Sequence, residues 1–382
     1  MKEFMFSVPQ NIIVGAKSLE KLPSLLKKMS VDHVFLISDR GLEKAGTVGK
    51  VVEILDREGI KHHEYLDVLP NPSVEIVNEA TNEYKSAGAD VIVALGGGSP
   101  MDVAKAVGVL AMYGGEITQY EGADKVPGKI VPMIAIPTTA GTGSEVTAFS
   151  VITDVTRNYK LTVFSYELIP AYALLDSELI MSLPPFVAAS TGLDALVHAM
   201  ESFLSKAANP FTDAMAEKAM ALIGGNIRSF VADRSNEEAA ENMMIASTFA
   251  GIAFAWARLG NVHAMAHPLG GFFHVPHGVA NAILLPYVLE YNALSDRGKY
   301  KKMYELIARN NKSDVEFTPS LLINEIKELL NELNIPSHLS QVGVTEDKIP
   351  EMAEDAMKSG NILVNPRQST KSDIEALYRI AL

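Results

Sequence analysis

The sequence contains no cysteine and is poor in basic residues. None of its 382 residues is Cys, which excludes disulfide bonds, thiolate metal ligands and cysteine nucleophiles. The formal net charge is −13, with 33 Lys and Arg against 46 Asp and Glu, and no segment forms a basic stripe. An acidic chain of this kind is a poor match for a nucleic-acid backbone. We therefore expect small-molecule partners and no nucleic acid.

Long hydrophobic runs are also absent. The longest apolar stretch, residues 243–257, is shorter than the roughly 18 residues that a membrane-spanning helix needs. The first residues, MKEFMFSVPQ, lack the continuous apolar core of a signal peptide. The sequence therefore predicts a cytoplasmic protein without a membrane partner.

The first half of the chain alternates strand and helix patterns. Short apolar segments at 34–38, 91–95 and 130–137 are rich in β-branched residues, and helical periodicity marks 48–59 and 74–88. Fully apolar strands separated by helices indicate a parallel sheet that is covered on both faces. This half is predicted to be an α/β domain.

The pattern changes near the SLPP segment at 182–185, beyond which strand signals are missing. Helical patterns follow at 186–205, 210–233, 237–256, 279–292 and 319–333. At this length two domains are the default. We predict an α/β domain over residues 1–183 and an all-α domain over residues 184–382.

A carboxylate and an imidazole share one face of the first of these helices. Asp194 and His198 are four positions apart, which places their Cβ atoms roughly 6 Å from each other on a helix. Taken alone, such a pair is more often a cap and a satisfied core histidine than a pair of metal ligands. The stretch HAMAHPLGGFFHVPHG then adds His263 and His277, and with these further imidazoles a metal site becomes the favoured interpretation. One carboxylate with neutral imidazoles and no thiolate suits Fe(II), Zn, Co or Ni better than Mg or Ca.

Two further histidines of this stretch are less certain as ligands. His267 is four positions after His263, but Pro268 follows it and favours a non-helical backbone at His267. It is either a ligand or a proton carrier beside the metal. His274 follows two phenylalanines in a predicted turn and is interpreted as a surface residue.

A glycine-rich turn follows the strand predicted at 91–95. In GGGSPMD, Ser99 fits the N-cap of the next helix, Pro100 its first position and Asp102 the third. Bare backbone N–H groups at a helix N-terminus favour a phosphate or pyrophosphate. Neither G-x-G-x-x-G nor a Walker motif is present, so a tight turn without a ligand remains the alternative.

A second loop of similar composition, PTTAGTGSEVT at 137–147, follows another predicted strand. Two such loops at the carboxyl ends of parallel strands mark the ligand-binding edge of an open α/β sheet. Asp39 follows the strand at 34–38, where an acidic side chain accepts from ribose hydroxyls and disfavours a 2′-phosphate, so NAD is preferred over NADP. An ordinary turn residue is the alternative for Asp39.

These segments together resemble the iron-dependent (group III) alcohol dehydrogenase family. The matching motifs are GGGSPMDVAKA, PTTAGTGSEVT, GLDALVHAMESFLS and HAMAHPLGGFFHVPHGVANAILLPYVLEYN, and the similarity extends from about Phe6 to the NPR segment at 365–367. The resemblance implies a dehydroquinate synthase-like architecture, with a dinucleotide-binding domain, a helical domain and an active-site cleft between them.

The resemblance also implies site residues. The family's metal ligands match Asp194, His198, His263 and His277, and His267 matches a residue that is not normally a ligand, which makes it the catalytic candidate. The family's cofactor contacts match Asp39, Asn71, Gly97, Gly98, Ser99, Thr138, Thr139, Thr147, Phe149, Lys160 and Leu179. A substrate pocket is expected at Phe149, Phe254 and Asn361.

The implied activity is that of a metal-dependent, NAD(H)-linked alcohol dehydrogenase (EC 1.1.1) acting on a short-chain primary alcohol and its aldehyde. Two phenyl rings in the pocket favour a small apolar alcohol. A diol dehydrogenase or lactaldehyde reductase, and a metal-dependent lyase on the same fold, are the alternatives. Fe(II) is the expected metal, with Zn or another divalent ion as a substitute, and a homodimer or higher homo-oligomer is expected, paired through the strand near residues 4–8.

Overall fold

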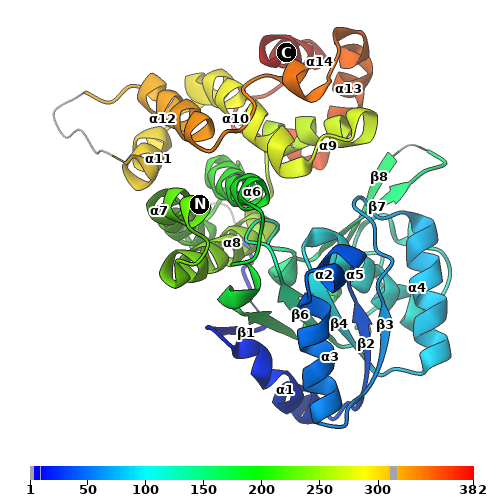
Figure 1. Ribbon diagram of the computed structural model, residues 1–382. Helices are drawn as coiled ribbons and strands as arrows, with labels where there is room; N and C mark the ends of the chain where they lie inside the picture. Colours follow the sequence, from blue (N-terminus) through cyan, green and yellow to red (C-terminus); the bar gives the residue numbers. More distant parts are fainter. Residues whose placement is uncertain (1–3, 9, 158, 310–315) are drawn as a thin grey trace. The chain divides into compact units, whose positions relative to one another are not determined.

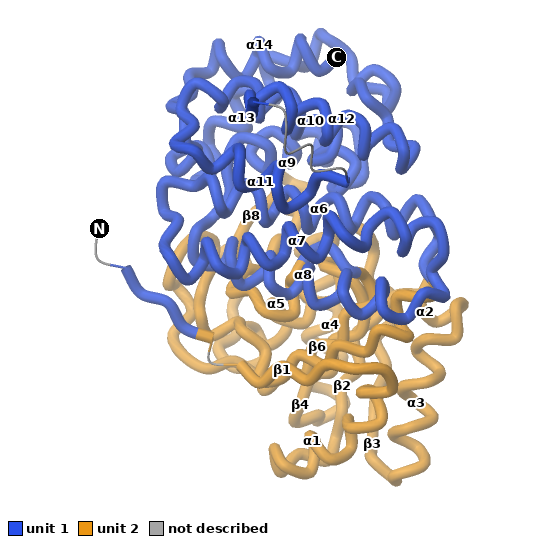
Figure 2. The backbone as a smooth tube through the Cα atoms, turned by 90° about the vertical axis from the view of Figure 1, so that its left-hand side faces the viewer, with its two compact units in different colours: residues 1–7, 140–142, 183–382 blue, residues 8–139, 143–182 orange. Residues whose placement is uncertain are grey.

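The computed structural model describes residues 4–8, 10–157, 159–309 and 316–382. The chain forms two compact units, drawn in two colours in Figure 2. Unit 2 comprises 8–139 and 143–182, and unit 1 comprises 183–382 together with the short segments 140–142 and the described residues 4–7. The loop at 137–147 therefore contributes three residues to the helical unit, although both of its ends belong to the sheet-containing unit.

Unit 2 is built on a six-stranded parallel sheet (Figure 1), and the α/β class expected from the sequence is confirmed. In spatial order the strands are β1 (Asn11–Val14), β9 (Tyr172–Leu175), β6 (Met133–Pro137), β4 (Val91–Gly96), β2 (His33–Ile37) and β3 (Lys61–Tyr65). Every pair in this order is parallel. The central strand β4 is buried along its whole length, as a sheet covered on both faces requires.

Helices cover both faces of this sheet. Alternate residues of β2 enter different cores, with Val34 in one and Phe35 in the other, because successive side chains of a strand point to opposite faces. The core of Val34 includes residues of α1 (Leu22–Met29) and α3 (Thr47–Arg57). The core of Phe35 includes residues of α4 (Val74–Ala87) and α5 (Gly98–Tyr113).

A small second sheet was not predicted from the sequence. Strands β7 (Phe149–Asp154) and β8 (Tyr159–Phe164) pair antiparallel, and β5 (Gly122–Ala123) joins β8. Burial alternates along β7, with Ser150 and Ile152 buried and their neighbours less so. The sequence does not show this period, because the buried positions include the polar residues Ser150 and Asp154, whereas Phe149 and Val151 are only half-buried.

The described part of unit 1 is helical, as expected. Its helices are α6 (Pro185–Leu204), α7 (Pro210–Ala232), α8 (Glu237–Ala257), α9 (Asn261–Phe273), α10 (His277–Asn292), α11 (Lys299–Ile307), α12 (Pro319–Glu332), α13 (Ile349–Ala356) and α14 (Lys371–Ala381). Among the described residues no single helix meets the length and hydropathy needed to cross a membrane, and only the pair α8 and α9, bent by 103°, does so by length and composition.

The backbone prediction at His267 was wrong. Helix α9 continues through His267 and Pro268 to Phe273, although proline disfavours a helical residue before it. The segment is held in place by burial, since Ala264, Met265 and Leu269 are almost completely inaccessible to solvent. Tertiary packing therefore overrides the local preference. His274 ends the helix with a φ of 55°, in the turn that was predicted there.

The cap predicted at Ser99 was also wrong. Helix α5 begins at Gly98 with Gly97 as its N-cap residue, and no side chain caps it. The chain turns early because Gly96 has a φ of +151°, a conformation that only glycine adopts readily. A Cβ atom at Gly96 would also lie 2.6 Å from the Pro100 ring. The helix start is therefore set by glycine geometry rather than by a serine cap.

Candidate metal centre

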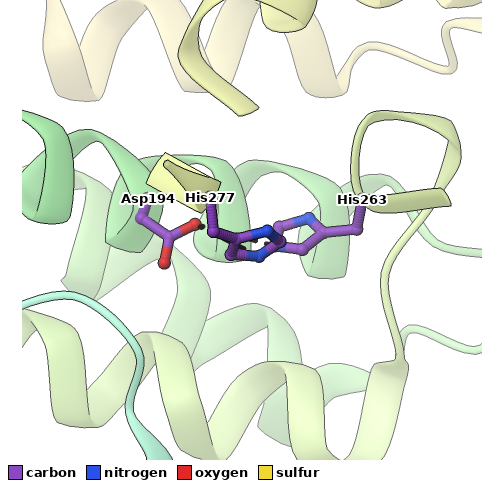
Figure 3. A group of neighbouring side chains, drawn as sticks. All are labelled: Asp194, His263 and His277. Carbon is purple, nitrogen blue, oxygen red and sulfur yellow. Dashed lines mark ion pairs between the residues drawn. The ribbon is translucent and has the colours of Figure 1, made fainter. Parts of the chain in front are cut away.

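Three helices bring metal-ligand side chains together in unit 1. Asp194 of α6, His263 of α9 and His277 of α10 offer ligand atoms that all lie within 4.8 Å of one another (Figure 3). Asp194 Oδ1 is 3.8 Å from His263 Nε2 and 3.9 Å from His277 Nε2. Asp194 and His263 are buried, whereas the His277 side chain is 35% exposed. The cluster is therefore enclosed on two sides and accessible at His277.

His198, the fourth ligand expected from the sequence, lies beside this group. It is one turn after Asp194 on α6, and its ring stacks on that of His263 with the centroids 4.6 Å apart. Its Nδ1 atom is 3.2 Å from the carbonyl oxygen of Gly141. An Nδ1–H that donates to this carbonyl leaves the Nε2 lone pair free to bind a metal.

Gly141 reaches that position because it has no side chain. A Cβ atom there would lie 2.7 Å from Cβ of Thr191 and 2.8 Å from the carbonyl oxygen of Thr191, both on α6. The loop can therefore approach α6 closely enough for the Gly141 carbonyl to hold the His198 ring.

Glu201 also belongs to this cluster, although the sequence analysis did not single it out. Its carboxylate accepts from His263 Nδ1 at 2.6 Å, from the backbone N–H of Val262 at 2.7 Å and from the N–H of His263 at 3.3 Å. Burial raises the pKa of Glu201 to about 7, and the N–H groups of Val262, Gly260 and His263 oppose that rise. A carboxylate that holds Nδ1–H fixes the tautomer in which Nε2 is free to bind a metal. The available signal was position, since Glu201 is three residues after His198 on one helix face.

Asn281 was also missed, and it contacts the whole cluster. Its Nδ2 atom lies 2.7 Å from Asp194 Oδ1, 3.0 Å from His263 Nε2 and 3.2 Å from His277 Nε2. It follows His277 by four positions on α10, so the i, i+4 spacing was the signal that could have found it. Asn281 is completely buried and helps to align the three side chains.

The electrostatics of the cluster favour a cation. Burial lowers the pKa of His198 and lowers that of His263 well below its ordinary value, so both imidazoles are neutral near pH 7. Burial raises the pKa of Asp194, and the neighbouring His198 opposes this. Neutral imidazole nitrogens and a carboxylate oxygen that converge in a buried site fit a borderline divalent metal such as Fe(II) or Zn.

His267 lies next to the cluster without being one of the three grouped ligands. Its ring stacks on that of His277 with a centroid separation of 5.4 Å, and it is partly accessible to solvent. Phe254 of α8 stacks on His198 at 4.4 Å. His274 is exposed and lies at the end of α9, and no described contact brings it or Asn361 to the cluster.

The residues expected to bind the cofactor lie in unit 2. Gly97, Gly98 and Ser99 form the start of α5, where the first backbone N–H groups lack partners inside the helix. A Cβ atom at Gly97 would lie 3.3 Å from Thr139 Oγ1, so the two glycine-rich loops approach each other closely. The N–H of Thr138 donates to Gly96 O at 3.1 Å.

The other residues expected to contact the cofactor make hydrogen bonds or packing contacts within unit 2. Asn71 and Lys160 are brought together, with Lys160 Nζ donating to Asn71 Oδ1 at 2.7 Å. Asp39 caps α2 (Arg40–Lys44) by accepting from the N–H of Leu42 at 3.0 Å, which leaves its second oxygen for another donor. The Phe149 ring packs against that of Phe164, tilted by 37° with the centroids 4.9 Å apart, and Leu179 is buried in the core that contains Val34.

Comparisons with known proteins match both units. Residues 9–177 match the family described as iron-containing alcohol dehydrogenase, and residues 188–382 match the C-terminal part of the Fe-containing alcohol dehydrogenase family. The chain is 38% identical to 1,3-propanediol dehydrogenase of Klebsiella pneumoniae over 99% of this chain and 98% of that protein.

Solved structures agree with these matches. A 1,3-propanediol oxidoreductase has a TM-score of 0.96 at 38% identity, with both chains fully covered. The sulfoacetaldehyde reductase of Bifidobacterium kashiwanohense, solved in complex with NAD+, has a TM-score of 0.91 at 29% identity, covering 100% of this chain and 99% of that one. The fold and family expected from the sequence are therefore confirmed, and the chain belongs to the iron-containing alcohol dehydrogenase family.

Proposed function

We propose that this protein interconverts a short-chain primary alcohol and its aldehyde, using NAD(H) and a divalent metal held by Asp194, His198, His263 and His277. The observation that carries the proposal is the convergence of a carboxylate and two imidazoles from three helices within 4.8 Å. Family membership supports the same reaction class. Fe(II) is the proposed metal, and Zn is an alternative because it binds such ligands more tightly than Fe(II) does in the Irving–Williams order.

In this proposal the protein holds the metal and orients the side chains that bind it. A bound metal would supply Lewis-acid polarisation of the substrate oxygen, which eases both alkoxide formation and aldehyde reduction. Glu201 keeps a proton on Nδ1 of His263 at 2.6 Å, and the Gly141 carbonyl does the same for His198 at 3.2 Å. These contacts direct the Nε2 lone pairs toward the metal position, and Asn281 aligns the carboxylate of Asp194.

His267 is proposed to carry the hydroxyl proton between substrate and solvent. Its ring stacks against His277, yet it is partly open to water. Imidazole side chains commonly act as general acids and bases, accepting a proton at one nitrogen and donating one from the other. His267 is therefore the proposed catalytic residue outside the ligand set.

NAD(H) is proposed to bind unit 2 through the start of α5. Gly97, Gly98 and Ser99 present backbone N–H groups to the pyrophosphate, and a helix N-terminus adds a favourable dipole. Asp39 keeps one carboxylate oxygen for the ribose, which would disfavour NADP. The remaining expected contacts are Asn71, Thr138, Thr139, Thr147, Phe149, Lys160 and Leu179.

The alcohol is proposed to be small and largely apolar, because the Phe254 ring lies directly against His198. Asn361 of unit 1 and Phe149 of unit 2 stay further proposed contacts of the alcohol. A diol is the second candidate, supported by the 38% identity to a 1,3-propanediol dehydrogenase. Comparing kcat/KM for 1,3-propanediol with that for ethanol and butanol decides between them, and a higher value for the diol overturns the apolar assignment.

A homodimer in the cytoplasm completes the proposal. Phe4 is 40% exposed, Met5 63% and Phe211 53%, and Phe6 stacks on Phe211 at 5.1 Å. An exposed apolar cluster of this kind favours a protein–protein interface. The cytoplasmic location is the one expected from the sequence and is kept here as part of the proposal.

The decisive experiment combines elemental analysis of anaerobically purified protein with NADH absorbance at 340 nm during incubation with alcohols. We expect one divalent metal per chain and steady NADH formation. Metal-dependent turnover without net NADH formation would instead support a lyase. Full activity after removal of the metal would contradict the proposed role of the four ligands.

A further inference from the structure

A lysine ammonium group lies inside unit 2. Lys105 is 0% exposed and belongs to α5, the helix whose first turn is the proposed pyrophosphate site. Its Nζ atom is 2.7 Å from the carbonyl oxygen of Ser144, 2.9 Å from that of Thr147 and 2.9 Å from that of Phe149. An ammonium group has three N–H donors, so these carbonyls can take one each. One side chain thus gathers three carbonyls from the segment 144–149, called here the anchored loop.

The surrounding charges keep this cation inside the protein. Asp102 lies one turn earlier on α5, and Glu145 belongs to the anchored loop. Burial lowers the pKa of Lys105 and raises that of Asp102, and each of the two groups opposes the shift of the other. The hydroxyl of Ser144 lies 3.1 Å from Nζ and donates to Asp102 Oδ1 at 3.4 Å. Three carbonyl oxygens within 2.9 Å of Nζ are the acceptors that an ammonium group needs, and Ser144 links Lys105 to Asp102.

The anchored loop has a shape that depends on a central cation. It begins after Gly143, which has a φ of +61°, makes a 3₁₀ turn over Ser144–Val146 and becomes extended at Thr147. Residues 144–148 are buried, so the three carbonyls that point to Nζ need donors inside the protein. Converging carbonyl dipoles repel one another, so we expect loss of the Lys105 charge to loosen the loop around Nζ.

We propose that Lys105 is a positioning residue whose charge holds the anchored loop in the shape that binds the cofactor. The inference rests on the proposed function, in which Thr147 and Phe149 of this loop and Gly98 and Ser99 of α5 contact NAD(H). Because Lys105 belongs to α5 and binds the loop, it fixes the two groups of contacts relative to each other within unit 2. Pre-ordering both groups lowers the entropy lost when the cofactor binds.

The test compares Lys105→Met, which keeps most of the length of the unbranched side chain without its charge, with Lys50→Met, which alters an exposed lysine of α3 in the same unit. Three quantities are measured: the Kd for NADH by calorimetry, hydrogen exchange of the loop amides, and metal content per chain. For Lys105→Met we expect Kd to rise about tenfold or more, since losing the bonds to a charged donor is strongly unfavourable. Loop amides should exchange faster and metal content should stay unchanged, whereas Lys50→Met should match the wild type.

A purely structural role predicts a lower melting temperature with a Kd within about twofold of the wild type, and that result would overturn the proposal. Unchanged loop exchange in Lys105→Met would overturn it as well. If Lys105→Met does not fold, hydrogen exchange of the wild type still tests the anchoring. The amides of the anchored loop must be protected from exchange before NADH is added. Exchange at the rate of an unstructured peptide would contradict the proposal. If the wild type does not bind NADH, the proposed function is refuted, and so is the claim that Lys105 positions cofactor contacts. The claim that Lys105 anchors the loop is tested separately, by hydrogen exchange of the loop amides.

Discussion

Replacing Glu201 with Gln tests whether the metal site depends on a residue that does not touch the metal. The carboxylate accepts from four groups, namely the Nδ1 atom of His263 and the backbone N–H groups of Val262, Gly260 and His263. Glutamine offers one acceptor oxygen and an amide group that donates. If that amide faces His263, Nδ1 must accept, so the proton moves to Nε2 and blocks the metal-binding lone pair.

The expected loss of metal affinity follows because an amide donor takes the place of a carboxylate acceptor beside His263. Loss of a partner that orients a metal-bound histidine typically lowers metal affinity 10- to 100-fold, or about 1.4–2.7 kcal/mol. Unfolding free energy should also fall by about 1–3 kcal/mol, because a buried N–H loses its acceptor. Glu217→Gln is the matched control, since Glu217 of α7 lies at the surface, 3.6 Å from Lys302.

The assay is competition for the metal with a coloured chelator, run beside thermal unfolding of the chelated protein. We expect Glu201→Gln to release metal at a chelator concentration 10- to 100-fold lower than the wild type or Glu217→Gln. Equal metal affinity in the three proteins would refute the argument that Glu201 controls His263.

Three further outcomes are expected. His267→Ala should lower kcat by 10²-fold or more, the usual range for a proton-transfer residue, with metal content unchanged; loss of metal would instead make His267 a ligand. Gly278→Ala should cost about 1–3 kcal/mol of stability and weaken metal binding, because its Cβ would lie 2.3 Å from the Ser190 carbonyl and push α10 away from α6; calorimetry and elemental analysis check this. Asp154→Asn should destabilise the protein at pH 6, but the difference should shrink as pH falls below about 4. The pKa of Asp154 is lowered from 3.8 to about 2 by hydrogen bonds from Thr156 and Arg157, so its contribution is present above pH 3.8 and is lost as pH falls through 2. Urea unfolding at several pH values measures this, and a constant difference would contradict it.

Much of the fold could be predicted because its signals are local. The apolar run of β4 marks a buried strand, and the period of α3 and α4 marks helices packed on a sheet. The hairpin of β7 and β8 was missed because its pairing joins segments whose apolar residues are interrupted by polar ones. At Pro268 and Ser99 local rules gave the wrong backbone, since burial and glycine geometry outweighed them.

The candidate metal site was likewise predictable from local sequence signals only in part. Residue types and motif spacing singled out Asp194, His198, His263 and His277, and the structure groups three of them within 4.8 Å with His198 alongside. Glu201 and Asn281 escaped notice because a lone glutamate or asparagine on a helix carries no chemical signal of its own. Their significance comes from contacts with residues 62 and 87 positions away in the sequence.

The sequence by itself determined which donors are available, which segments become helices and strands, and to which family the chain belongs, because these depend on residue chemistry and short-range periodicity. Only the tertiary structure decided which lone pair each histidine presents and where the buried ammonium of Lys105 goes. Those outcomes depend on which polar groups meet when distant segments pack together, and a buried polar group is stable only beside a partner that the folded chain supplies.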